Sequence, residues 1–154
     1  MADKKITILY VDDEENNLFS FKAAFRIKYQ VYTAISGDEA LKILAEKAVH
    51  IIVTDQRMPG MTGVEFLEKV ILAFPDPIRL LLTGYADMAA VVDAINKGKI
   101  FHYLTKPWNE EELDITINRA YEAYLEKLKL KEENEKLETS NDQLEFLLRQ
   151  KLLS

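Results

Sequence analysis

The chain contains no cysteine and only two histidines among its 154 residues. Without cysteine there is neither a disulfide framework nor thiolate chemistry, which favours a cytoplasmic protein. The shortage of histidine and cysteine together argues against a structural zinc site. The function therefore has to be sought in other side chains.

Long apolar runs are also missing. No run is long enough to span a membrane, and the first residues, Met-Ala-Asp-Lys-Lys, lead into a strand-like stretch without the apolar segment of a signal peptide. Hydrophobic residues still make up 48% of the chain, which is enough for a core. The length predicts one domain plus an extension. Because long apolar runs are missing, no membrane partner is expected.

Positive charge is scarce in the last third of the chain. The net charge is −6, and residues 110–154 contribute 12 acidic and 7 basic side chains to it. An acidic extension does not suit the phosphate backbone of a nucleic acid, so direct nucleic-acid binding is not expected of this chain.

Apolar, β-branched runs alternate with segments whose apolar residues recur at helical spacing. The predicted strands are residues 6–11, 30–35, 51–55, 78–82 and 100–105. Helices are expected from Asn16, over the stretches carrying residues 40–48 and 64–74, over residues 87–97, and from Asn109. Either Ser36 or Asp38 is a candidate cap of the second helix. This alternation predicts an α/β fold of the flavodoxin-like (βα)5 type, a doubly wound five-stranded parallel sheet in the order 2-1-3-4-5.

Carboxylates follow two of the predicted strands. Asp12 and Asp13 end the first strand and Asp55 ends the third, and these strands are neighbours in the predicted order. Three carboxylates in one crevice repel one another, and a hard divalent cation such as Mg²⁺ relieves that repulsion. Asp55 can then act as a nucleophile toward phosphorus and form an acyl phosphate.

Two further polar residues end the remaining strands on the same edge. Lys106 at the tip of the fifth strand can neutralise a phosphoryl oxygen, and the Thr83 hydroxyl after the fourth can donate to another. Each residue alone is typical of an ordinary turn or strand end. Their joint occurrence at the ends of strands one, three, four and five points specifically to a site for a divalent cation and a phosphoryl group.

The chain resembles the receiver domain of two-component response regulators over residues 5–122. The resemblance lies in four motifs: Val11-Asp12-Asp13-Glu14, Asp55-Gln56-Arg57-Met58-Pro59-Gly60-Met61-Thr62-Gly63, Leu82-Thr83-Gly84 and Tyr103-Leu104-Thr105-Lys106-Pro107. It implies that Asp55 is the phosphoacceptor for a histidine kinase or phosphotransfer protein.

The same resemblance assigns the other site residues. Mg²⁺ would be held by Asp12, Asp13 and Asp55 with the backbone carbonyl of Arg57. Thr83 and Lys106 would contact the phosphoryl group, and Tyr103 would be the aromatic switch. The Lys106–Pro107 peptide bond would be cis.

Two departures from the commonest family pattern lie close to this site. Gly84 stands where alanine is frequent, which predicts a looser loop after the switch threonine. Arg57 and Tyr85 are bulky, and we expect them to restrict the hydrolytic water and slow the loss of the phosphoryl group.

The remainder of the chain has neither proline nor glycine from Asn109 onward. Asn109 and Glu112 predict a capping box, and an apolar stripe from Leu113 to Tyr124 can pack on the domain. Leucines at 130, 137 and 144 recur every seven residues and predict a coiled coil, with Asn134 and Asn141 at the a positions.

We divide the chain into a receiver domain, residues 1–122, and a helical extension, residues 123–154. The extension is either a linker to a missing output domain or a dimerisation helix. Folding back on the domain is the alternative, but the heptads and polar flanks favour a parallel homodimer.

A phosphohydrolase is the alternative to the signalling module. A Mg²⁺-dependent phosphohydrolase with an aspartyl phosphate typically has a second acid two residues after its nucleophile. Arg57 occupies that position here, and no substrate cap region is present. We therefore expect no enzyme activity beyond self-phosphorylation from a phosphodonor and self-dephosphorylation.

Overall fold

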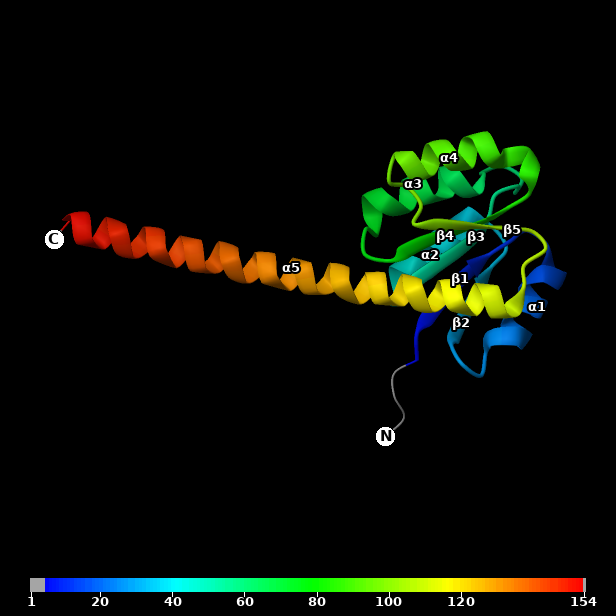
Figure 1. The fold of residues 1–154 in the computed structure, drawn as a ribbon, viewed down its shortest axis with the longest axis horizontal. Helices are drawn as coiled ribbons and strands as arrows, with labels where there is room; N and C mark the ends of the chain where they lie inside the picture. Colours follow the sequence, from blue (N-terminus) through cyan, green and yellow to red (C-terminus); the bar gives the residue numbers. More distant parts are fainter. Residues whose placement is uncertain (1–4, 154) are drawn as a thin grey trace.

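The computed structural model describes residues 5–153, with the side chains of Tyr85 and Leu153 outside the described part. Five strands alternate with five helices and one 3-10 turn (Figure 1). The strands are β1 (Thr7–Val11), β2 (Gln30–Ala34), β3 (Ile51–Asp55), β4 (Ile78–Thr83) and β5 (His102–Thr105). The helical elements are α1 (Glu15–Phe25), α2 (Gly37–Glu46), α3 (Gly63–Ala73), η1 (Tyr85–Asp87), α4 (Met88–Asn96) and α5 (Glu110–Leu153).

The strands form one parallel sheet in the order β2-β1-β3-β4-β5, which confirms the predicted topology. Val11 of β1 pairs with Thr54 of β3, so the residues that follow these two strands lie at one edge of the sheet. Parallel strands place all their carboxyl ends on the same edge, which is where open α/β folds bind ligands.

Each face of the sheet is covered by its own set of helices. Ile8 and Tyr10 of β1 belong to the core beneath α1 and α5, and Leu9 and Val11 belong to the core beneath α2, α3 and α4. Successive side chains of a strand point to opposite faces, so one short strand contributes to both cores. The strands are apolar on both faces because both faces are buried.

The fifth strand begins at His102, two residues later than predicted. Just before the strand, the Phe101 amide donates to the Arg79 carbonyl at 2.8 Å, and the Arg79 guanidinium binds two further backbone carbonyls. Its Nε donates to the Lys99 carbonyl at 2.7 Å and one terminal nitrogen donates to the Gly98 carbonyl at 3.3 Å. These carbonyls are satisfied by a side chain instead of a strand ladder.

Helix termini follow the expected chemistry with small shifts. Ser36, and not Asp38, caps α2, since its Oγ accepts from the Glu39 amide at 3.2 Å. The helix expected over residues 87–97 is α4, which is preceded by η1. Asn109 Oδ1 accepts from the Glu112 amide at 3.0 Å, which is one of the two hydrogen bonds of the predicted capping box.

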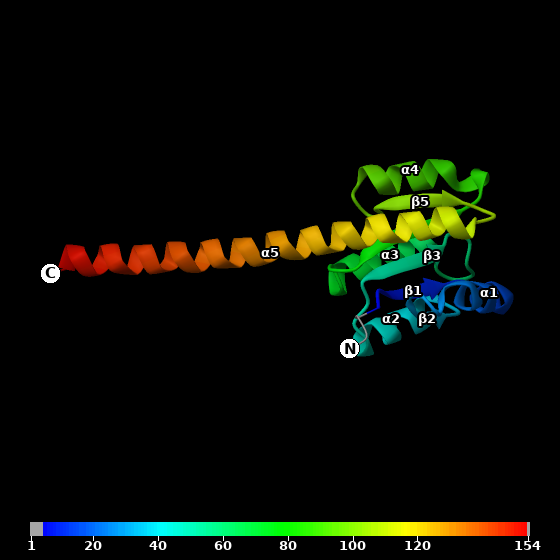
Figure 2. The ribbon, with the colours of Figure 1, turned by 60° about the horizontal axis from the view of Figure 1, so that its bottom comes forward.

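Helix α5 is a single unbroken helix of 44 residues. Its first turns bury Leu113, Ile117 and Ala120 completely against the sheet, and the rest extends far beyond the domain (Figures 1 and 2). Among residues 5–153, no helix combines the length and apolar character that a bilayer span requires.

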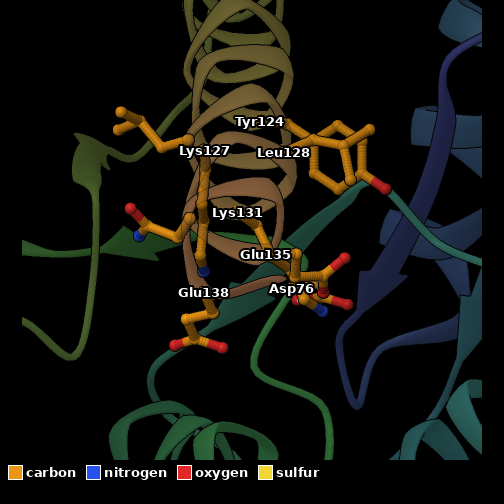
Figure 3. A pocket seen from close by; sticks show the side chains of 9 residues that line it. Asp76, Tyr124, Lys127, Leu128, Lys131, Glu135 and Glu138 are labelled. Carbon is orange, nitrogen blue, oxygen red and sulfur yellow. The ribbon is translucent and has the colours of Figure 1, made fainter. Parts of the chain in front are cut away.

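Two lysines fasten α5 to the domain at the point where it leaves. Lys127 donates to the carbonyl of Pro75, and the Lys131 ammonium lies 3.7 Å from a carboxylate oxygen of Asp76. In Figure 3 the Lys131 and Asp76 side chains lie near each other beside the helix, with Tyr124 and Leu128 nearer the domain. The direction of the helix is therefore fixed by contacts at the edge opposite the strand ends that carry the acidic residues.

Candidate functional site

Three carboxylates meet at the carboxyl edge of the sheet. Asp55 is the last residue of β3, while Asp12 and Asp13 follow β1 directly. Each offers one oxygen, and these oxygens all lie within 4.8 Å of one another. Asp12 and Asp55 are buried and Asp13 is half-buried. The structure therefore brings together the three acids that the sequence placed in one crevice.

Lys106 reaches the same point from the tip of β5. Its ammonium forms an ion pair with Oδ1 of Asp55, and the Lys106–Pro107 peptide bond is cis, the isomer that the resemblance implied. Burial raises the pKa of Asp55 above its usual value, Lys106 opposes that rise, and Asp12 and Asp13 add to it. The site thus holds more negative charge than one lysine balances.

The donor set suits a hard cation. Carboxylate oxygens are the ligands that Mg²⁺ takes in proteins, usually one or two of them together with water and phosphate oxygens. A cation bound between these acids would lower their mutual repulsion and oppose the raised pKa of Asp55. The residues present therefore fit Mg²⁺.

Asp12 is held by three donors. The Tyr10 hydroxyl donates to its Oδ2 at 2.9 Å, and the Asn17 side-chain amide donates to the same oxygen at 3.1 Å. The Glu14 backbone amide donates to Oδ1 at 3.0 Å. The carboxylate is consequently fixed in orientation on both of its oxygens.

The turn after Asp55 is fixed by close backbone approach. A Cβ added to Gly63 would lie 2.4 Å from the Asp55 carbonyl oxygen and 2.8 Å from a methyl carbon of Leu81. Gln56 is buried, and its side-chain oxygen accepts from the Val64 amide at 2.9 Å, at the start of α3. The loop therefore returns directly to the strand end that carries Asp55.

The two proposed switch residues lie on neighbouring strands. Thr83 ends β4, is 1% exposed, and donates its hydroxyl to the Gly84 carbonyl at 3.1 Å. It pairs with Thr105 in the sheet, while Tyr103 pairs with Leu81. Tyr103 is half-buried and packs against the core beneath α2, α3 and α4.

Arg57 makes a contact that the sequence did not predict. Its Nε donates to a carboxylate oxygen of Asp87 at 3.0 Å, which joins the loop after β3 to η1, and the side chain is 69% exposed. The Tyr85 side chain lies outside the described part of the chain. That these two residues slow the loss of the phosphoryl group stays a prediction.

Tyr10 and Asn17 also contact the site, and neither was predicted from the sequence. The signal for Tyr10 was present, because residues two apart in a strand share a face, and Tyr10 is two residues before Asp12. Asn17 lies in the first turns of α1, and nothing in its spacing indicated which acid its amide contacts.

A family model described as the response regulator receiver domain matches residues 8–118. The chain belongs to this family. Fold, strand order and the acidic strand ends all agree with that membership, and the signalling role of the receiver as a phosphoacceptor fits them.

The receiver is similar to curated transcriptional regulators. It is 38% identical over 123 residues to the hydrogenase transcriptional regulatory protein HoxA of Cupriavidus necator, covering 80% of this chain and 26% of that protein. It is 30% identical over 134 residues to the regulatory protein AtoC of Escherichia coli, covering 86% and 29%. The chain thus spans about a quarter of the length of these relatives.

Solved structures give the same picture. An adenylate cyclase from Rhodopirellula baltica matches with a TM-score of 0.80 and 34% identity, covering 86% of this chain and 98% of that chain. A CheY-like receiver from Methanospirillum hungatei matches with a TM-score of 0.75 and 27% identity, covering 80% and 99%.

These relatives bear on the expected partners. Receivers interact with histidine kinases or phosphotransfer proteins, as the resemblance implied. The expectation that the chain has no nucleic-acid partner gains no support, because the curated relatives are transcriptional regulators.

Proposed function

We propose that this receiver accepts a phosphoryl group on Asp55 from a histidine kinase or phosphotransfer protein in the cytoplasm, and that α5 passes the change on. The observation that carries the proposal is the convergence at Asp55. A buried carboxylate at a strand end lies with two further carboxylates and one ammonium, all from other strand ends.

The chemistry follows from these side chains. One oxygen of Asp55 forms the new bond to phosphorus, the bond from phosphorus to the donor's imidazole nitrogen breaks, and its electron pair stays on that nitrogen. When bound between Asp12, Asp13, Asp55 and the Arg57 carbonyl, Mg²⁺ supplies positive charge against the phosphoryl oxygens.

Lys106 and Thr83 complete the contacts to the phosphoryl group. The Lys106 ammonium, already paired with Asp55, neutralises a phosphoryl oxygen. The Thr83 hydroxyl leaves the Gly84 carbonyl and donates to another, and Tyr103 moves inward into the space that this opens. The conformational change begins on β4 and β5.

The test of the phosphoacceptor is incubation with Mg²⁺ and acetyl phosphate, followed by intact mass measurement. We expect one phosphoryl group per chain, no addition in Asp55→Asn, and normal addition in the control Asp38→Asn, an exposed acid in the first turn of α2. A phosphorylated Asp55→Asn would refute the assignment, and sustained hydrolysis of a phosphomonoester by the parent would favour the phosphohydrolase.

The extension, residues 123–154, is proposed as a parallel dimerisation helix. Leu130, Leu137, Leu144 and Leu148 form a stripe that we call the seam, and these side chains are 57–60% exposed. The seam lies roughly a quarter of a turn around α5 from the stripe that packs on the domain, since each residue adds about 100°. The receiver therefore leaves the seam uncovered for a second copy.

Two features keep this helix pair weak. Asn134 and Asn141 occupy a positions, where asparagine costs stability but favours an in-register parallel pair. In that pair Glu133 at g faces Glu138 at e of the second copy, and the like charges repel. A weak pair responds to a small change at the receiver, which suits a switch.

A further inference from the structure

Tyr10 is buried in an aromatic cluster, yet its hydroxyl points at the acidic site. The side chain is 1% exposed, and its ring stacks on Phe21 with centroids 4.1 Å apart and planes within 1°. Phe21 in turn lies edge-on to Trp108 at 6.0 Å. The ring therefore has one position, and the hydroxyl that it carries has one direction.

The hydroxyl donates to Asp12. Its hydrogen bond ends on Oδ2 of Asp12, at a distance of 2.9 Å between the two oxygens. A buried hydroxyl needs such a partner, and a carboxylate is a strong acceptor.

The three donors leave one lone-pair position of the Asp12 carboxylate for a further ligand. A carboxylate has about four lone-pair positions on its two oxygens. Tyr10 and Asn17 take two on Oδ2, and the Glu14 amide takes one on Oδ1. The remaining position is on Oδ1, so these donors leave one oxygen of Asp12 to meet Asp13 and Asp55.

We propose that Tyr10 is a positioning residue for the metal: it orients Asp12 so that Oδ1 is presented to Mg²⁺, with Asn17 as the second donor. The inference rests on the proposed function, because it takes Asp12 as a Mg²⁺ ligand. Groups that hydrogen-bond to metal ligands orient them, and their removal typically weakens metal binding about 10- to 100-fold.

The alternative is that the Tyr10 hydroxyl only stabilises the fold. Tyr29 offers the matched control, since it is also buried in the core beneath α1 and α5 and its hydroxyl donates to the carboxylate of Asp114. Tyr29→Phe removes the same group from the same core at a carboxylate outside the acidic site.

The experiment is a calorimetric titration of the full chain with MgCl₂, with thermal unfolding measured in parallel. We expect Tyr10→Phe, which retains the ring stacking, to raise the Mg²⁺ dissociation constant about tenfold. Asn17→Ala should raise it less, because its amide is shared with Glu14 at 3.3 Å. Tyr29→Phe should leave it unchanged, even where it lowers the unfolding temperature.

Three outcomes decide the matter. Weaker Mg²⁺ binding in Tyr10→Phe, with parent-like binding in Tyr29→Phe, supports the positioning role. Parent-like Mg²⁺ binding in Tyr10→Phe, or equal weakening in Tyr29→Phe, overturns it while leaving Asp55 as the phosphoacceptor. Absence of Mg²⁺ binding by the parent overturns both the positioning role and the metal site on which it rests.

Discussion

Gly63 lies where a side chain would collide with the backbone that carries Asp55. It is the first residue of α3, where alanine would otherwise be favoured by helix propensity. The distance of 2.4 Å from its added Cβ to the Asp55 carbonyl oxygen leaves no room for a methyl group. The backbone itself would have to move.

We therefore expect Gly63→Ala to lower the free energy of unfolding by about 1–3 kcal/mol, the usual cost of overpacking. It should also reduce phosphorylation of Asp55, because the strand end shifts. Gly84→Ala is the control, since a Cβ there meets nothing within 4 Å. Urea denaturation of both variants checks this, and equal stability of the two would contradict it.

The sequence predicted the residues of the acidic site better than it predicted the residues that contact them. Asp12, Asp13, Asp55 and Lys106 were predictable because parallel strands must end at one edge, whatever the details of packing. Strand periodicity places Tyr10 on the same face as Asp12, but the contact of Arg57 depends on side-chain direction and loop path, which periodicity does not determine. The contacts of Arg79 were likewise not predictable, because its guanidinium reaches carbonyls 19 and 20 residues away.

Helix α5 is tied to the corner between α1 and β2 by one carboxylate. Asp114 accepts from the Tyr29 hydroxyl, and its other oxygen pairs with Lys28 at 3.0 Å. The hydrogen bond from Tyr29, with help from Lys28, lowers the pKa of Asp114. The ionised carboxylate is thus better stabilised in the folded protein than in the unfolded chain.

Removing the Asp114 carboxylate should weaken the attachment of α5 in a pH-dependent way. Because the folded-state pKa of Asp114 is lowered, its contribution is present above the unfolded pKa of about 3.9 and is lost as pH falls through the folded value. Asp114→Ala should cost about 1.5–2 kcal/mol near pH 7, in the lower part of the range for a hydrogen bond to a charged group. The deficit should shrink below about pH 4.

Urea denaturation near pH 7 and below about pH 4 measures the difference in unfolding free energy between the parent and Asp114→Ala. Asp93→Ala is the control, since Asp93 pairs with Lys97 four residues on, with both side chains more than half exposed. Such surface pairs contribute little. A pH-independent deficit in Asp114→Ala would mean that the lost contact is not electrostatic.

At the scale of the element, prediction succeeded where one local rule dominates. The length of α5 follows from 44 residues without glycine or proline, and its start follows from the Asn109 cap. The lysine contacts at Pro75 and Asp76 were out of reach, because they join segments more than 50 residues apart through flexible side chains.

In the whole molecule, the exposed seam predicts how two copies meet. The absence of native cysteine allows single-cysteine variants to report proximity directly. In a parallel, in-register pair, Asn141 at an a position faces Asn141 of the second copy. Asn141→Cys should therefore form a disulfide-linked dimer under mild oxidation.

Phe146→Cys supplies the matched control. Phe146 lies on the same stretch of helix and is 61% exposed, but it occupies an f position away from the seam. We expect no efficient crosslink there, as judged by non-reducing electrophoresis. Equal crosslinking at both positions would indicate random collision, and crosslinking of neither would contradict the in-register parallel pair.

Because α5 is unbroken, its length sets both how far its C-terminal end lies from the domain and which way that end faces. Each residue added to the helix carries everything beyond it about 1.5 Å further and turns it about 100°. A change of seven residues in the exposed part therefore alters reach while nearly restoring aim, whereas a change of two or five residues alters aim most. Beyond Lys131, lengthening or shortening the extension by seven residues therefore moves its far end along the helix axis and leaves the orientation of that end nearly unchanged.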